Sequence, residues 1–187
     1  LILEAFTLTN KIPLVLVGNW DKSPYGIELK EKYSKHQNIY ILDPIYDQKK
    51  LDVLRSNAAL YVHGHTAGGT NPSLVEAMYL GLPILANGVS YNKVTTEYKA
   101  IYFDNLETLI HELDNIYTSK LKQIGTEMEE IAKRRYTWSH IAQKYQLLVD
   151  EALTIRTKNA VIPDISTLKN EALLNSGLAH FKTFKSF

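Results

Sequence analysis

Short apolar runs recur along the first two thirds of the chain and predict buried β-strands. The first of them, Leu14-Val15-Leu16-Val17, is followed directly by Gly18-Asn19. Runs of this length that are rich in branched apolar residues and bounded by turn-forming residues are typical of strands in a protein core. We expect such strands at residues 14–17, 38–42, 58–62, 83–86 and 100–103.

Segments with helical spacing of apolar residues separate these runs. Helices are predicted at residues 1–8, 27–33, 47–56, 73–80 and 106–117. Strands that alternate with helices in this way indicate βαβ units, in which the strands are mainly parallel and helices cover both faces of the sheet. The predicted fold class is therefore α/β, doubly wound.

The chain changes character twice after the last predicted strand. From residue 120 the pattern is wholly helical and predicts a pair of helices that closes a domain of residues 1–153. Residues 154–187 are polar and basic, with at most one amphipathic helix at residues 165–181. This extension is either solvated or a basic surface for a partner or anionic lipid.

Composition narrows the function classes. The 187 residues are 45% hydrophobic, which is enough for a sizeable core, and 21 basic residues nearly balance 20 acidic ones. No global basic field argues for nucleic acid, so an anion site would have to be local. The chain has no cysteine, which fits a reducing compartment.

The apolar runs and the N-terminus bear on where the protein is located. No apolar run approaches the roughly 20 residues needed to span a bilayer, so no transmembrane segment is expected. The chain opens without Met or a signal peptide, so we expect a piece of a longer cytoplasmic protein.

Chemistry is expected at the carboxyl ends of the strands, where open parallel sheets bind their ligands. Residues 18–26 follow the first strand, and Gly18 there permits close approach of a backbone, although a plain turn explains it equally well. Residues 43–46 follow the second strand and lead to Asp47, a predicted helix cap.

The third loop combines several residue types that suit an anion. Gly68-Gly69 frees the backbone, Thr70 or Asn71 can cap the next helix, and Pro72-Ser73 suits its first turn. The start of such a helix favours phosphate, and Glu76 one turn later can accept hydrogen bonds from the vicinal hydroxyls of a ribose. Together they predict a nucleoside diphosphate site. A dipole-complementing acid and a flexible glycine pair are the alternatives.

Two histidines precede this loop. His63 and His65 would share a face of a continuing strand, so a metal site must be considered. The remaining histidines lie in helical or pre-strand contexts and supply no third ligand. We expect no metal. The pair is predicted either to donate to phosphate or sugar hydroxyls or to be structural.

The ordered motifs resemble the C-terminal half of a family 4 glycosyltransferase of the GT-B fold, over about residues 1–153. The motifs that carry the resemblance are Leu14-Val15-Leu16-Val17-Gly18, residues 39–46 before 51–58, residues 69–78, Gly81-Leu82-Pro83-Ile84-Leu85-Ala86, and Tyr136-Thr137-Trp138. Three of its motifs are further similar to those of rhamnosyltransferase-like enzymes that build bacterial cell-surface polysaccharides. They are His63-Gly64-His65, Gly68-Gly69-Thr70-Asn71-Pro72-Ser73-Leu74 and Glu76-Ala77-Met78.

The resemblance implies roles for individual residues. Glu76 would hold the donor ribose, and the backbone of Ile45 would contact the base. The loop Gly18-Asn19 and the amides of Gly69, Thr70, Asn71 and Ser73 would face the diphosphate and the sugar. Most members have a carboxylate where this chain has Gly68, so His65 or Asn71 would substitute for it. Lys93 either approaches the site or is solvated.

The resemblance also implies a function for the longer protein. It would be a retaining glycosyltransferase that moves a sugar, rhamnose being one candidate, from a nucleotide diphosphate sugar to a glycan or lipid-linked glycan. The N-terminal half of the same protein would bind this acceptor in the cytoplasm or on the inner membrane face. No cofactor is expected, and no catalytic residue is assigned. A nucleotide-sugar epimerase of the same fold and a non-catalytic nucleotide- or protein-binding module remain as alternatives.

Overall fold

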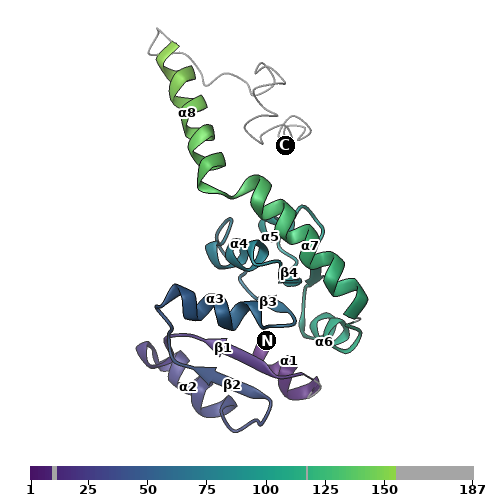
Figure 1. The fold of residues 1–187 in the computed structure, drawn as a ribbon. Coiled ribbons are helices and arrows are strands. Elements are labelled where there is room, and N and C mark those ends of the chain that lie inside the picture. The colour runs from purple at the N-terminus through teal and green to yellow at the C-terminus, as the bar shows by residue number, and fades with distance from the viewer. Residues whose placement is uncertain (10–11, 117, 155–187) are drawn as a thin grey trace. The chain divides into compact units, whose positions relative to one another are not determined.

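The computed structural model describes residues 1–9, 12–116 and 118–154, and it divides into two compact units. The first unit, Leu1–Glu129, contains every strand of the described chain (Figure 1). The second begins at Glu130 and includes α8 (Trp138–Thr154). The basic extension predicted at residues 154–187 lies, apart from Thr154, outside the described residues.

The strands of the first unit form two parallel sheets. In one sheet β1 (Leu14–Val17) pairs with β2 (Ile39–Leu42), with Leu14 opposite Ile39. In the other β4 (Ile84–Asn87) lies between β3 (Tyr61–His63) and β5 (Ile101–Phe103), with His63 opposite Ala86. All pairings are parallel, so the strands of each sheet end at one edge.

Helices connect the strands, as the alternating pattern predicted, and the α/β class is confirmed. The helices of the first unit are α1 (Ile2–Thr9), α2 (Pro24–Tyr33), α3 (Gln48–Ser56), α4 (Pro72–Tyr79), α5 (Ser90–Thr95) and α6 (Leu106–Asp114), with a 3-10 turn at Trp20–Lys22. α7 (Thr118–Arg135) crosses the boundary between the units, and with α8 it confirms the predicted pair of C-terminal helices. No helix of the described ranges is both long and apolar enough to cross a membrane.

The core of the first unit is built from the inward faces that the helical spacing identified. Leu74, Ala77 and Met78 of α4 are fully buried, as are Ile84 and Leu85 of β4. α1 packs against α6, and Phe6 of α1 has an exposed fraction of only 2%. At about 25 cal/mol per Å² of apolar surface, each of the buried leucine, isoleucine, methionine and phenylalanine side chains contributes about 2 kcal/mol to folding.

Several predicted boundaries were wrong. The strand expected at 58–62 begins only at Tyr61, because Arg55 accepts a backbone hydrogen bond from Ala58 and extends the end of α3. The helix expected at 27–33 begins at Pro24, where the Ser23 side chain accepts from the amide of Gly26 at 3.1 Å. The helix expected at 106–117 ends at Asp114, and the short helix α5 was not predicted.

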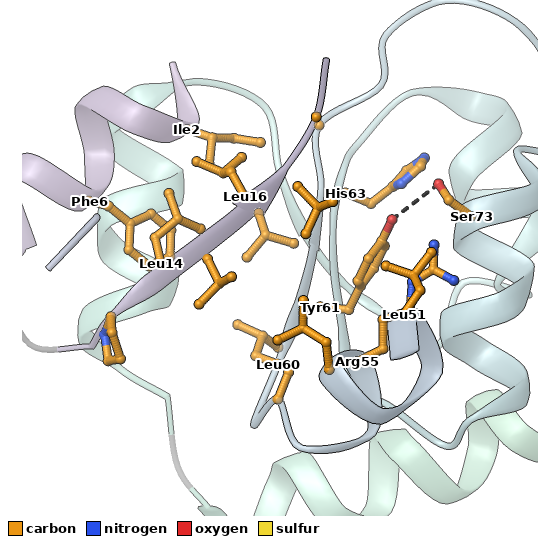
Figure 2. A pocket seen from close by; sticks show the side chains of 18 of the residues that line it. Ile2, Phe6, Leu14, Leu16, Leu51, Arg55, Leu60, Tyr61, His63 and Ser73 are labelled. Carbon is orange, nitrogen blue, oxygen red and sulfur yellow. Dashed lines mark hydrogen bonds between the residues drawn. The ribbon is translucent and has the colours of Figure 1, made fainter. Parts of the chain in front are cut away.

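Within the described chain no pairing joins β1 to β3, so the parallel strands form two sheets. The two strands instead flank a cavity of about 1200 Å³ lined by apolar side chains such as Leu14, Leu16 and Val62. Figure 2 shows Phe6, Leu14 and Leu16 on one side of this cavity and Tyr61, His63 and Ser73 on the other.

Candidate functional site

Two loops at the carboxyl ends of β1 and β2 are tied together. The amide of Gly18 donates to the carbonyl of Leu42 at 3.2 Å, and the Trp20 indole donates to the same carbonyl at 2.9 Å. The amide nitrogen of the Asn19 side chain donates to the Tyr46 hydroxyl at 3.3 Å. These contacts place Gly18 and Asn19 beside the loop that holds Ile45, and Gly18 and Ile45 both line the cavity.

The third loop joins β3 to α4 and carries the predicted anion site. The Asn71 side-chain oxygen accepts from the amide of Ser73 at 2.9 Å and from its hydroxyl at 2.7 Å. Asn71, and not Thr70, is therefore the cap of α4. The Tyr61 hydroxyl donates to the Ser73 oxygen at 3.1 Å (Figure 2), which fixes the first turn of the helix against β3.

Backbone amides remain free at this cap and in the two residues before it. The amides of Gly69, Thr70 and Asn71 make no hydrogen bond within the described ranges. Ser73, by contrast, has its amide and hydroxyl proton committed to Asn71. Three free amides next to the N-terminus of α4 form a place where a negatively charged group is stabilised.

Gly68 has a backbone that explains its identity. Its φ is +110°, a value that residues with a Cβ rarely adopt, although the space around it is open. A glutamate at this position would strain the loop before it reached a ligand. The positive φ of Gly68 therefore favours glycine over the carboxylate that the resemblance led us to expect there.

Glu76 lies in α4 and reaches an arginine of α3. The Arg55 Nη1 atom contacts the Glu76 Oε2 atom at 2.5 Å. The side chain of Arg55 is only 13% exposed, whereas that of Glu76 is 42% exposed. The carboxylate is thus held from one side and accessible to solvent from the other. Arg55 also lines the cavity, and it was not among the residues predicted to form the site.

His63 is buried with an exposed fraction of 1%, and in the described chain neither of its ring nitrogens has a hydrogen-bond partner. Its ring stacks between Tyr61, at 6.0 Å between centroids, and His65, at 4.7 Å. Burial, followed by repulsion from His65, lowers the pKa of His63 to about 4. The imidazole is therefore neutral at pH 7 and can donate through one nitrogen and accept through the other.

Metal binding gains no support from this geometry. No cluster of three histidine or acidic side chains with the spacing of a metal site occurs in residues 1–9, 12–116 and 118–154. Lys93, expected either to approach the site or to be solvated, lies over the Tyr102 ring, 5.6 Å from its centroid.

Another residue that sequence reasoning missed is Asn92 in α5. It is fully buried, and its side-chain nitrogen donates to the carbonyls of His65, at 3.1 Å, and Asn87, at 3.0 Å. The hydroxyl of Thr70, in the loop, lies 3.3 Å from the hydroxyl of Thr95, which is also in α5. α5 therefore anchors the loop between β3 and α4. A small polar side chain after a predicted strand was the only local signal.

The cavity thus brings together five of the predicted residues, Gly18, Ile45, His63, His65 and Ser73. Asn19, Gly69, Thr70, Asn71 and Glu76 are not among its lining residues. Asn19 is bonded to the Tyr46 side chain next to Ile45, Asn71 is bonded to Ser73, and Glu76 is bonded to Arg55.

Comparison with known proteins places this geometry in a structural class. No family model matches the chain, and no curated protein matches it in sequence. Among solved structures, sucrose-phosphate synthase from Thermosynechococcus elongatus is similar with a TM-score of 0.70 and 21% identity, over 81% of this chain and 41% of the synthase.

Two structures with bound nucleotide are also similar. HepE from Anabaena in complex with UDP-glucose matches with a TM-score of 0.67 and 19% identity, over 79% of this chain and 43% of HepE. The pneumococcal O-GlcNAc transferase GtfA in complex with UDP and GlcNAc matches with 0.60 and 16%, over 82% and 32%. This chain spans less than half the length of each of the three. The described structure has an α/β fold that matches half of a GT-B glycosyltransferase fold.

Proposed function

We propose that this chain is the donor-binding half of a glycosyltransferase and that it binds a nucleotide diphosphate sugar at the junction of β3 and α4. The observation that carries the proposal is the juxtaposition of three free backbone amides, at Gly69 to Asn71, with the accessible carboxylate of Glu76. Asn71 and Glu76 are five residues apart, or about 7.5 Å along a helix axis, a separation that a ribose 5′-diphosphate spans.

The roles within this site follow from the donors and acceptors present. The amides of Gly69, Thr70 and Asn71 and the dipole of α4 stabilise the diphosphate, including the charge that develops when it leaves the sugar. The carboxylate of Glu76 accepts from ribose hydroxyls. Ile45 lines the cavity and contacts the base. The neighbouring Gly18-Asn19 loop faces the diphosphate and the sugar, and neutral His63 with His65 meets the diphosphate or sugar hydroxyls. No residue of this chain is assigned as a catalytic base.

Finer features rest on resemblance. A retaining transfer to a glycan or lipid-linked glycan, with the acceptor on an N-terminal half, is what the motifs of residues 14–18 and 69–78 imply. Rhamnose as the sugar rests only on the resemblance of the motifs at residues 63–65, 68–74 and 76–78. The two structures similar in fold that hold UDP or UDP-glucose make UDP the first nucleotide to test.

Calorimetric titration of the 187-residue chain with UDP, GDP, ADP and dTDP tests the proposal. We expect at least one of them to bind, and Glu76→Gln to weaken binding of a ribonucleotide by about tenfold, the loss typical of a hydrogen bond to a charged group. Glu112→Gln, a surface carboxylate of α6, serves as the matched control. Failure of all four nucleotides to bind the folded chain overturns the proposal.

Transferase and epimerase are separated with the longer protein that contains this chain. It is incubated with a panel of nucleotide sugars that includes a rhamnosyl donor, with and without a glycan acceptor. A glycosylated product that requires acceptor supports the transferase. Isomerisation of the nucleotide sugar without acceptor supports the epimerase, and binding without either product supports a non-catalytic module.

A further inference from the structure

Arg55 connects the proposed ribose site to a helix that does not otherwise contribute to it. Arg55 lies in the last turn of α3 and Glu76 in α4, 21 residues later, and the ion pair joins the two helices. Among the described residues the other carboxylate within 4 Å of Arg55 is that of Asp52, one turn earlier, at 3.9 Å from Nη1. The shorter contact and the better alignment for hydrogen bonding therefore belong to Glu76.

The difference in exposure gives the two partners different roles. The Arg55 side chain is largely buried, so it has few positions to adopt, and its charge needs a partner. A half-exposed glutamate has several rotamers available to it, and ordering them on ligand binding costs free energy. Because Arg55 holds Oε2, the carboxylate is ordered before a ligand arrives.

The same contact leaves acceptor capacity on Glu76. The Oε1 atom makes no hydrogen bond to the described part of the chain, and Oε2 retains a second lone-pair direction. Two neighbouring hydroxyls can therefore be accepted while the ion pair stays intact. The positive charge of Arg55 also offsets the repulsion between Glu76 and a nearby diphosphate.

We propose that Arg55 is a positioning residue for Glu76, one that pre-orders this carboxylate for the vicinal hydroxyls of a ribose and so sets the preference for ribonucleotides over 2′-deoxyribonucleotides. The inference rests on the proposed function and adds to it the residue that determines selectivity at the ribose. Arg55 acts through Glu76 and does not itself contact the nucleotide.

The test is calorimetric titration of the 187-residue chain with UDP and 2′-deoxy-UDP. The wild type is expected to prefer UDP. Arg55→Met removes the charge and keeps an apolar stem, and it should lower UDP affinity by about tenfold while lowering 2′-deoxy-UDP affinity much less. Arg55→Lys should lose about threefold, because the ammonium keeps the charge but the flexible lysine side chain holds Oε2 less rigidly. Asp52→Asn, the matched control on the same helix, should bind both nucleotides as the wild type does.

A double-mutant cycle separates positioning from a general effect on the fold. If Arg55 acts through Glu76, Arg55→Met should cause no further loss of UDP affinity in a Glu76→Gln background. Urea unfolding of each variant checks that it is folded. Should Arg55→Met fail to fold, Arg55→Lys decides, because an unchanged preference for UDP in that variant overturns the proposal.

The remaining outcomes are equally decisive. UDP affinity in Arg55→Met that equals or exceeds that of the wild type overturns the positioning role, and an increase means that the ion pair competes with the ligand. If Glu76→Gln weakens UDP binding and Arg55→Met does not, only the role of Arg55 is wrong. Absence of nucleotide binding by the wild type refutes the proposed function itself.

Discussion

The imidazoles of His63 and His65 stack with their centroids 4.7 Å apart, and His63 is the buried member of the pair. Alternate residues of a strand share a face. His63 is the last residue of β3, and the ring of His65, two residues later, stacks on the ring of His63. Burial disfavours a positive charge on His63, and a charge on His65 at this distance would disfavour it further. The pair is therefore arranged to hold His63 neutral.

Folding stability should fall with acid because of His63. Its pKa is about 4 in the folded chain against the ordinary 6.5, so between these values the unfolded chain binds a proton that the folded chain does not. Stability is then lost as the pH falls from 6.5 to 4, by up to about 3 kcal/mol from this group. The measurement is urea unfolding at pH 4 to 7 of the wild type and of His63→Asn.

His63→Asn cannot take up the proton, so its stability should depend less on pH over this window than that of the wild type. His111→Asn, which changes an exposed histidine of α6, is the control and should retain the acid sensitivity of the wild type. Parallel pH curves for wild type and His63→Asn would show that His63 is not a buried neutral imidazole.

The two glycines of the third loop should respond differently to substitution. Gly68→Ala forces an alanine to φ +110° and should lower the free energy of unfolding by about 1–2 kcal/mol. Gly69→Ala meets open space and no positive φ, so its effect should stay within about 0.5 kcal/mol. Thermal unfolding of both variants checks the difference. Equal losses would mean that the loop takes another course.

Asn92 should stabilise the chain through its two buried hydrogen bonds. Asn92→Ala leaves the carbonyls of His65 and Asn87 without this donor and should cost about 2–3 kcal/mol in urea unfolding. The control is Asn115→Ala, which removes an exposed side-chain hydrogen bond to the His111 carbonyl and should cost less than about 1 kcal/mol. A loss for Asn92→Ala as small as that of the control would contradict the anchoring role of α5.

Two helix caps separate stability from binding. Asn71 caps α4 and Asp47 caps α3, where its side chain accepts from the amides of Lys49 and Lys50. Replacement of either by alanine should lower stability by about 1 kcal/mol. Only Asn71→Ala should also weaken UDP binding, because only α4 begins at the proposed diphosphate site. A similar loss of UDP affinity in Asp47→Ala would place the nucleotide elsewhere.

Much of the fold was predictable because local patterns decide it. The apolar runs of β1 and β4 are buried segments whose neighbours are turn formers, and both structure and sequence place them within a residue. The cap of α4 could be narrowed to Thr70 or Asn71, since both precede Pro72 and the apolar face begins at Leu74, and the structure selects Asn71. The separation of β1 from β3 depends on contacts between distant segments, so no local pattern announced it.

The sequence allowed us to predict which residues form the site, but not the backbone conformation and the contacts between distant side chains there. Gly68 stood out as a missing carboxylate, and only the backbone shows the positive φ that a glutamate would have to adopt. Arg55 was missed because its partner lies 21 residues away on another helix. Its signal was present: Leu51 and Arg55 are four residues apart and share the inward face of α3, where a basic residue requires a partner.

The central claim is that a nucleoside diphosphate binds at the junction of β3 and α4. Titration of the ¹⁵N-labelled chain with UDP, followed by amide chemical shifts, tests it most directly, with Gly81 and Gly88 as reporters outside the proposed contacts. Saturable shifts of the amides of Gly69, Thr70 and Asn71 are expected, with half-saturation in Glu76→Gln at an about tenfold higher UDP concentration. Saturable shifts confined to other parts of the chain, or none at millimolar UDP, would contradict it.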